Sequence, residues 1–307
     1  MTSPLVVSVP DTYLADALRS LDPTLDVVVW DLEGPPPRDH IDVVVPDYLA
    51  PKSRLANTAG LATRLIQSQS IGYDGVAPHL PVGVVYANAT SVHEASTAEL
   101  AVALILASQR GLPGFVRAAD QGRWSFEFRP SLADRTVLLL GYGGVGRAIE
   151  DRLIAFEVDL IRVARHARRI GDVEVHAWGE LATLLPRADI VVVTLPLSPE
   201  TTHLVDAVFL SRLDDHCLVV NVGRGPVVDT DAVLAEATSG RLRFALDVVD
   251  PEPLPEHHPL FALDNVLISP HVGGATSAMA PRVISLIAEQ VARVQRGEEP
   301  INVVLRT

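Results

Sequence analysis

Cysteine is nearly absent from this chain of 307 residues, which contains only Cys217. A single cysteine excludes an intramolecular disulfide, and the apolar run CLVVNV that it begins favours a buried thiol over a nucleophile. Such a chain is expected in a reducing cytoplasm. The N-terminal segment MTSPLVVSVPDTYL has no basic region and only a short apolar run, so we do not expect a signal peptide.

Basic residues are fewer than acidic residues, and the chain has no long apolar run. The chain has 38 acidic and 25 basic side chains, which gives a formal net charge of −13. This balance argues against general binding to nucleic acid or to anionic membranes. The apolar stretch ELAVALILAS is too short to span a bilayer and carries Glu99. We therefore expect neither nucleic acid nor a membrane as a partner.

Metal-ligand spacing is also missing from the sequence. His257 and His258 are adjacent in a predicted loop, but no further Cys or His follows them at a spacing typical of zinc sites. We therefore predict no metal site.

The most informative motif in the sequence is a glycine-rich turn. The segment VLLLGYGGVGRAI, residues 137–149, has the pattern of a buried strand, a tight turn and the start of a helix. Gly141 permits the turn, Gly143 lets a pyrophosphate approach the backbone, and Gly146 lets the helix pack against the strand. A simple glycine turn is the alternative, which the flanking strand and helix disfavour. The predicted dinucleotide site comprises Gly141, Tyr142, Gly143, Gly144, Val145 and Gly146.

Short apolar runs alternate with helical patterns along the whole chain. Near-continuous Val, Ile and Leu strands predict an α/β fold with doubly wound parallel sheets. Helices are predicted for Thr12–Arg19, His93–Ser108 and Ala275–Arg296, and a connecting loop for Gly111–Ala133. The predicted strands are Leu5–Val9, Val27–Trp30, Val43–Val45, Arg64–Gln69, Gly83–Asn88, Val137–Leu140, Leu160–Val163, Val173–Val175, Ile190–Thr194, Leu218–Val222, Phe244–Asp247 and Val266–Ser269, with Ile301–Leu305 extended.

Three polar side chains follow strands in the second half of the chain. Arg224 stands between two glycines, and its planar fork suits bidentate capture of a carboxylate. Glu252 lies in a loop stiffened by prolines, and His271 stands just before a Gly-Gly pair. Each residue alone is compatible with an ordinary surface loop. Parallel strands end at one edge of a sheet, however, where doubly wound folds bind their ligands.

Together these residues suit hydride transfer between a dinucleotide and a 2-oxo or 2-hydroxy acid. Arg224 would anchor the carboxylate and polarise the carbonyl, and His271 would exchange the hydroxyl proton. Glu252 would stabilise the imidazolium and orient its ring. The cofactor would supply the hydride chemistry.

The end of the predicted strand Leu160–Val163 indicates which cofactor is preferred. Ala164 stands where folds that bind NAD usually carry the acid that holds the ribose 2′-OH. Arg165 and Arg168 instead offer positive charge where a 2′-phosphate would lie. We predict that NADP is preferred over NAD. The alternative is a solvated basic turn, with NAD accepted through arginine stacking on the adenine.

One loop in the first half could contact a ligand. Ser70, Ile71 and Gly72 follow a predicted strand, and their backbone N–H groups could hold a carboxylate. The residues alone favour an ordinary turn between strand and loop.

The chain resembles the D-isomer-specific 2-hydroxyacid dehydrogenase family, including its glyoxylate/hydroxypyruvate reductase-like members. The matching motifs occur in family order and are LLLGYGGVGRAI, TLPLSPETTHLV, NVGRGPVVD, ALDVVDPEPLP and NVLISPHVGGAT. SIGYDG and VHEASTAELAVALIL match more loosely. Glu252 departs from the glutamine of the family's formate dehydrogenases, and the regulatory extension of many phosphoglycerate dehydrogenases is not seen.

The resemblance implies a domain organisation and a set of site residues. A Rossmann cofactor domain, residues 102–274, would be inserted into a flavodoxin-like substrate domain made of residues 1–101 and 275–307, with a helical hinge. Arg224, Glu252 and His271 would be catalytic, and the loop of Ser70, Ile71 and Gly72 would bind the substrate carboxylate. A homodimer is also implied. The further cofactor-binding residues are Thr194, Leu195, Pro196, Val222, Gly223, Asp247, Gly273 and Gly274.

A different class of function is the alternative. Some relatives in this family act as corepressors that sense the cofactor with little turnover. The intact set of Arg224, Glu252 and His271 favours an enzyme, because a binding module would not need it. Substrate preference is expected to depend on the loop Tyr73–Pro78 and the segment Trp124–Phe128.

Overall fold

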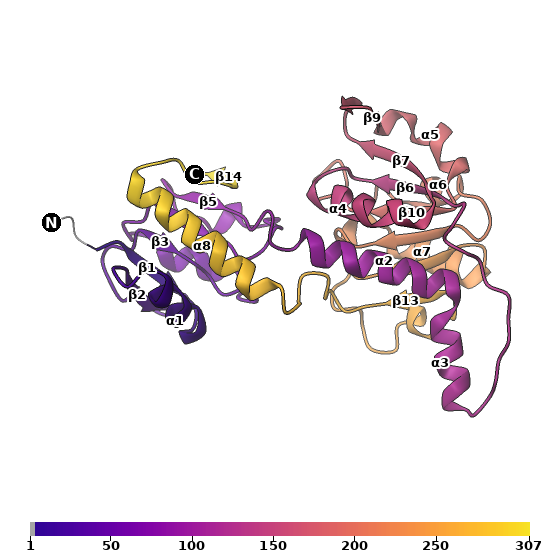
Figure 1. Cartoon of the computed structure of the whole chain (residues 1–307), viewed down its shortest axis with the longest axis horizontal. Helices are drawn as coiled ribbons and strands as arrows, with labels where there is room; N and C mark the ends of the chain where they lie inside the picture. Colours follow the sequence, from indigo (N-terminus) through magenta and orange to yellow (C-terminus); the bar gives the residue numbers. More distant parts are fainter. Residues whose placement is uncertain (1–3) are drawn as a thin grey trace. The chain divides into compact units, whose positions relative to one another are not determined.

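The structure is a computed structural model that describes residues 4–307 (Figure 1). The chain forms two compact units, Met1–His93 with Ser277–Thr307 (unit 1) and Glu94–Thr276 (unit 2). The boundary expected at residues 101/102 falls inside helix α2, Glu94–Arg110. This helix belongs entirely to unit 2, because it packs on a helix and two strands of that unit. Residues 1–3 of the predicted substrate domain lie outside the described residues.

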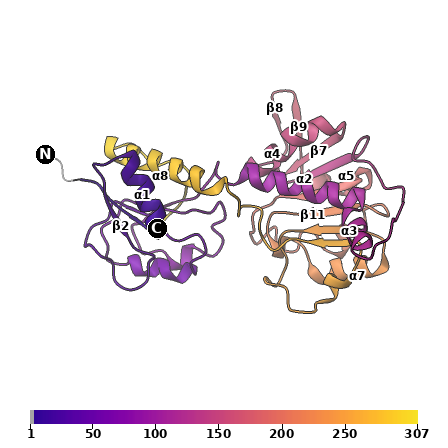
Figure 2. The same ribbon diagram turned by 60° about the horizontal axis from the view of Figure 1, so that its bottom comes forward.

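Unit 1 is built on a six-stranded sheet in the order β14-β5-β4-β3-β1-β2. All neighbouring strands are parallel except the pair β14 and β5. Helices α1 (Thr12–Leu21) and α8 (Met279–Arg296) bury their apolar residues in one core cluster and lie side by side (Figure 2). The strands are β1 (Val6–Val9), β2 (Asp26–Val29), β3 (Val43–Val44), β4 (Leu65–Gln67), β5 (Val85–Ala87) and β14 (Val303–Arg306).

Unit 2 is built on an eight-stranded sheet in the order β13-β12-β11-β10-β6-β7-β9-β8. Every pair is parallel except β8 with β9, so the predicted α/β fold with two parallel sheets is confirmed. The strands are β6 (Thr136–Leu140), β7 (Asp159–Ala164), β8 (Arg168–Ile170), β9 (Val173–Ala177), β10 (Ile190–Val193), β11 (Leu218–Asn221), β12 (Arg243–Leu246) and β13 (Val266–Ile268). The helices besides α2 are α3 (Leu112–Asp120), α4 (Gly144–Leu153), α5 (Leu181–Leu184), α6 (Ala207–Leu210) and α7 (Thr230–Ser239).

One expectation about local structure was wrong, and one strand was not predicted. The segment 111–133 contains helix α3, which begins after Gly111 in a left-handed conformation and tolerates Pro113 in its first turn. The arginine-rich stretch after β7 is not only a turn, because Arg168 begins the short strand β8. All three residues of β8 are exposed, so no apolar alternation marked this strand in the sequence.

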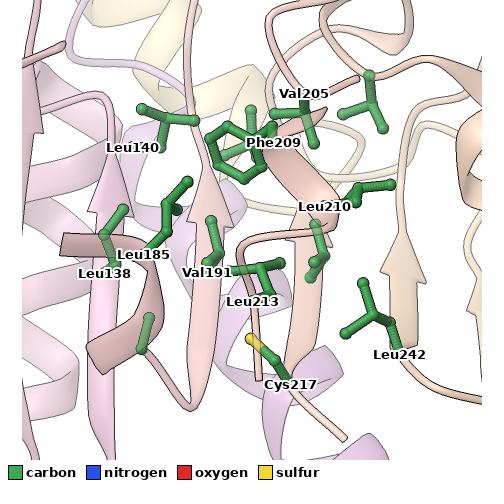
Figure 3. Close-up of a cluster of buried hydrophobic side chains, with 14 of the residues drawn as sticks. Leu138, Leu140, Leu185, Val191, Val205, Phe209, Leu210, Leu213, Cys217 and Leu242 are labelled. Atoms are coloured by element: carbon green, nitrogen blue, oxygen red, sulfur yellow. The ribbon is translucent and has the colours of Figure 1, made fainter. Parts of the chain in front are cut away.

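The central strands of unit 2 are buried on both faces. Alternate residues point to opposite sides, so Leu138 and Leu140 enter one core cluster, while Val137 and Leu139 enter the other. Cys217 lies in the first cluster among leucine, valine and phenylalanine side chains (Figure 3). Its burial raises the pKa of the thiol to about 12, which agrees with the predicted inert, buried cysteine.

A fully buried amide joins three parts of unit 1. Gln290 on α8 donates from Nε2 to Gln67 Oε1 at 2.7 Å and to the carbonyl oxygen of Ile301 at 2.8 Å. Its Oε1 accepts from the N–H of Ile301 at 3.1 Å. These bonds connect the C-terminal helix to β4 and to the segment that leads into β14.

We predict that Gln290→Leu destabilises the protein by about 1–3 kcal/mol, because the buried Gln67 Oε1 and the Ile301 backbone lose the hydrogen bonds that Gln290 makes with them. Equilibrium urea denaturation measures this loss. Gln295→Leu, on an exposed face of the same helix, is the matched control. Equal stabilities of the two variants would contradict the structural role of this amide.

Candidate active site

The glycine turn after β6 has a geometry that other residues cannot adopt. Gly141 has a φ of +111°, and a Cβ there would lie 2.6 Å from Thr194 Oγ1. A Cβ on Gly146 would lie 2.3 Å from the carbonyl oxygen of Gly141, so α4 packs directly on the turn. Thr194 Oγ1 also donates to that carbonyl at 2.9 Å. The turn is thereby held against the loop that follows β10.

The start of helix α4 is open where a phosphate group would need space. No atom of the described residues lies within 4 Å of a Cβ built on Gly143, which caps the helix. Helix α4 begins at Gly144, where a Cβ would lie 3.1 Å from Glu94 Oε1, so the open side of the helix start is that of Gly143. Free N–H groups at a helix start beside a bare backbone fit the pyrophosphate of a dinucleotide.

Glycine packing also joins the loops that follow β11 and β12. A Cβ on Gly225 would lie 1.9 Å from the carbonyl oxygen of Val249, a separation that no side chain permits. Arg224 is therefore carried on a loop in direct contact with the one that leads to Glu252. The Arg224 backbone is held by Asn221, whose Nδ2 donates to the Arg224 carbonyl oxygen at 3.0 Å.

The loop after β13 is held by a buried carboxylate. Asp247 is 3% exposed, and its Oδ1 accepts from Ser269 Oγ at 2.7 Å and from the Val272 N–H at 2.9 Å. Its Oδ2 accepts from the Gly273 N–H at 2.9 Å. The Asp247 carbonyl oxygen accepts from the His271 N–H at 2.8 Å. Nothing in the sequence spacing indicated that Asp247 holds this loop.

His271 and Glu252 are brought together by this arrangement. His271 Nδ1 contacts Glu252 Oε1 in a short hydrogen bond, and both side chains are partly exposed. The His271 backbone is in the left-handed region, with a φ of +52°. Such a conformation needs support from its surroundings, which the Asp247 bonds provide. Because Nδ1 is directed at the carboxylate, Nε2 is the ring nitrogen that can exchange a proton with a ligand.

The two arginines predicted to contact a 2′-phosphate lie near the carboxyl end of β7. Arg168 Nη2 donates to the carbonyl oxygen of Tyr142, inside the glycine turn, at 2.9 Å. Arg165 Nη2 lies 3.2 Å from Glu200 Oε1 on the loop after β10. Glu200 could not be predicted from the sequence, because the two residues are far apart in the chain and meet only through the sheet order.

A charged network behind the turn was also missed. Arg162 on β7 donates from Nε and Nη2 to the two carboxylate oxygens of Glu150 at 3.1 and 2.7 Å. Burial alone would raise the pKa of Glu150, but hydrogen bonds from Arg162 and Tyr142 outweigh it and lower this pKa. Burial, together with the Glu150 carboxylate, raises the pKa of Tyr142. The network fixes Tyr142, the second residue of the glycine motif.

We predict that the stability contributed by Glu150 disappears in acid. Its pKa is lower in the folded state than in the unfolded state, so the stabilisation is complete above the unfolded value of about 4.3 and is lost as pH falls through the folded value. The difference in Tm between wild type and Glu150→Gln should therefore shrink below about pH 4. Asp151→Asn, an exposed neighbour on α4, is the control. A difference that is constant with pH would contradict the assigned network.

The loop Ser70–Gly72 lies in unit 1. Its shape is set by Asn88, whose Nδ2 donates to the Ile71 carbonyl oxygen at 2.8 Å, and by Ser68, whose Oγ accepts from the Ser70 N–H at 3.0 Å. Within residues 4–307, no acceptor is recorded for the N–H groups of Ile71 and Gly72. A cavity of about 80 Å³ adjoins the loop, with Tyr48, Lys52, Arg54, Ser70 and Gly72 among its lining residues.

No group of three or more His, Cys, Asp or Glu side chains within residues 4–307 could hold a metal ion. No single helix in that part of the chain has the length and apolarity to cross a membrane, although α2 and α3 together meet the criterion as a pair bent by 66°.

Known proteins that resemble this chain show which family carries these loops. The NAD-binding domain of the D-isomer specific 2-hydroxyacid dehydrogenases matches residues 102–273. A glyoxylate reductase from Thermofilum pendens is 34% identical over 250 residues, which cover 77% of this chain and 73% of that protein. The chain belongs to the D-isomer specific 2-hydroxyacid dehydrogenase family.

Solved structures agree with this assignment of the dehydrogenase. A D-isomer specific 2-hydroxyacid dehydrogenase from Xanthobacter autotrophicus Py2 in complex with NADPH and MES is 29% identical, with a TM-score of 0.84 and coverage of 99% of this chain and 98% of that one. An NADPH-dependent glyoxylate/hydroxypyruvate reductase from Sinorhizobium meliloti, in complex with NADP and sulfate, is 25% identical, with a TM-score of 0.83 and the same coverages. The dehydrogenase is thus an NAD(P)-dependent oxidoreductase that acts on a small 2-hydroxy or 2-oxo acid.

Proposed function

We propose that the dehydrogenase reduces a small 2-oxo acid to the D-2-hydroxy acid with NADPH, and that Arg224, Glu252 and His271 perform the chemistry. The observation that carries this proposal is the contact between His271 Nδ1 and Glu252 Oε1 at the sheet edge that also holds the glycine turn. The bound nicotinamide would supply the hydride. Glyoxylate and hydroxypyruvate are the first substrates to test, because they appear in the names of the relatives.

The proton step follows from the orientation of the imidazole. Glu252 holds Nδ1–H, so the protonated ring presents Nε2–H to the carbonyl oxygen of the substrate. As that oxygen gains negative charge it takes the Nε2 proton, and the neutral ring keeps its bond to Glu252. In the oxidising direction Nε2 accepts the hydroxyl proton, and the Glu252 carboxylate stabilises the imidazolium that forms.

The substrate carboxylate needs positive charge and hydrogen-bond donors. Arg224 is half-buried on a rigid loop, which suits a charge-assisted contact with the carboxylate and polarisation of the carbonyl. We propose that the N–H groups of Ile71 and Gly72 also bind the carboxylate, since no acceptor within residues 4–307 is recorded for them.

The cofactor is held through the residues around the glycine turn in this proposal. Its pyrophosphate would lie at the start of α4, and its 2′-phosphate beside Arg165 and Arg168. The absence of an acid at position 164 supports a preference for NADP. The two solved relatives contain NADPH or NADP, which supports the same preference.

We propose that two copies pair through α3 and the segment after it. Trp124, Phe126 and Phe128 are 96%, 74% and 94% exposed, and Val116 on α3 is 60% exposed. Helix α3 extends away from the sheet of unit 2 (Figure 1). Aromatic side chains so accessible within one short segment mark an interaction surface. A second copy of this chain is the proposed partner, because the chain resembles a family whose members are usually dimers.

We predict that Arg224→Ala lowers kcat/KM for glyoxylate by about a hundredfold or more, because it removes both the charge and the fork that hold the carboxylate. The dissociation constant for NADPH, measured by fluorescence titration, should change little. Arg212→Ala removes an exposed arginine of the same unit and is the control. Normal turnover in Arg224→Ala would remove this residue from the active site.

We predict that the double variant Arg165→Ala with Arg168→Ala lowers kcat/KM with NADPH by about tenfold to a hundredfold, while the value with NADH stays within about threefold. Steady-state kinetics with both cofactors measure the ratio. A wild type that prefers NADH, or a double variant that retains full NADPH efficiency, would contradict the proposed cofactor preference.

We predict a dimer in light scattering coupled to size-exclusion chromatography. Trp124→Ser with Phe128→Ser should shift the species to the mass of one chain, 33.0 kDa, because both exposed rings would be removed from the interface. Ser substitutions at the exposed residues Leu49 and Val82 of unit 1 are the control. A monomeric wild type, or a dimeric double variant, would count against this surface.

A further inference from the structure

The exposed ion pair between Arg165 and Glu200 joins two loops at the carboxyl edge of the unit 2 sheet. Arg165 follows β7, and Glu200 lies on the loop after β10; these strands flank β6 on either side. The side chains are 59% and 48% exposed, and Arg165 Nη2 lies 3.2 Å from Glu200 Oε1. The pair involves the same guanidinium that the proposed function assigns to a 2′-phosphate.

Glu200 is the fixed member of the pair. Ser198 Oγ donates to Glu200 Oε2 at 2.7 Å. The loop is held internally by Thr201, which is 2% exposed, accepts from the Ser198 N–H at 2.8 Å and donates to the Pro196 carbonyl oxygen at 2.8 Å. The Ser198 hydrogen bond, with the backbone and Arg165, lowers the pKa of Glu200, so the carboxylate is charged at neutral pH.

We propose that Glu200 is a specificity-determining residue, whose carboxylate competes with the 2′-phosphate of NADP for Arg165 and so limits the preference for NADP over NAD. This inference rests on the proposed binding of NADP at Arg165. A 2′-phosphate carries a charge of about −1.5 to −2 at neutral pH. To contact Arg165, it must share or displace the Arg165–Glu200 pair.

NAD does not have to displace the Arg165–Glu200 pair. Its ribose 2′-OH is neutral, so Arg165 can remain on Glu200 when NAD binds. Glu200 thus supplies, from the loop after β10, a negative charge near the strand end where Ala164 offers none. Arg168 differs from Arg165, since its Nη2 donates to a neutral carbonyl oxygen of Tyr142 and not to a carboxylate. The negative charge at residue 200 therefore acts chiefly on Arg165.

The test measures binding of cofactor fragments by isothermal titration calorimetry. The ligands are adenosine 2′,5′-bisphosphate and 5′-AMP, which differ by the 2′-phosphate. Glu200→Gln should bind the bisphosphate about threefold to tenfold more tightly than wild type, with 5′-AMP changed by less than about twofold. The ratio of kcat/KM for NADPH over NADH should rise by a similar factor. Glu298→Gln, which breaks the exposed Arg296–Glu298 pair in unit 1, is the matched control and should change neither.

The double variant Arg165→Ala with Glu200→Gln identifies the route of the effect. The gain from Glu200→Gln should vanish when Arg165 is absent, because the competition is then removed. Unchanged or weaker bisphosphate binding in Glu200→Gln overturns the inference, as does a gain that persists without Arg165. If Arg165→Ala alone leaves bisphosphate binding unchanged, the proposed NADP site fails and the inference fails with it. Loss of affinity in Arg165→Ala, without gain in Glu200→Gln, overturns the inference alone.

Discussion

Parallel pairing of the central strands of unit 2 is the constraint on which the candidate site depends. Strands β6, β10, β11, β12 and β13 are hydrogen-bonded in register, so their following loops all begin at one edge. Burial on both faces makes this register rigid, because a shift would move the alternating apolar side chains out of the two core clusters. The loops that carry the polar side chains therefore start from a sheet whose register can shift only at a large cost in buried apolar contacts.

Rigid positioning continues from the sheet edge to the proposed catalytic residues. The buried carboxylate of Asp247 accepts hydrogen bonds from the loop after β13 and supports the left-handed backbone of His271. The close contact of Gly225 with Val249 links the Arg224 loop to the Glu252 loop. The three proposed catalytic side chains are thus positioned through contacts of their backbones, so little further ordering is needed when a ligand binds.

The cofactor edge of the same unit is organised differently. Behind the glycine turn, Glu150 and Arg162 form a sheltered bidentate pair, which is expensive to break. Further out, Arg165 and Glu200 are exposed, and water screens their attraction. A weak pair of this kind can be exchanged for a ligand charge, whereas the sheltered pair cannot. This contrast separates the structural charges of the turn from those available for recognition.

Local patterns in the sequence were sufficient for most of the strands and for the glycine turn, and they also led to Arg224, Glu252 and His271 as candidate catalytic residues. Such features depend on neighbouring residues alone: a β-branched run, a glycine at positive φ, a charged side chain between small residues. Helix α3 escaped prediction because Pro113 and Gly114 in its first turn are typical of a loop, and strand β8 because its three residues are all exposed.

Pairings between distant segments were decided only by the tertiary structure. Asp247 meets the backbone of residues 272 and 273, Glu150 meets Arg162, and Glu200 meets Arg165, in each case because strand order brings separate loops or elements together. The sequence by itself determined which residues could carry chemistry and which fold would present them. It could not determine which charge faces which, since that depends on strand order and on packing across the sheet, neither of which is recorded in local spacing.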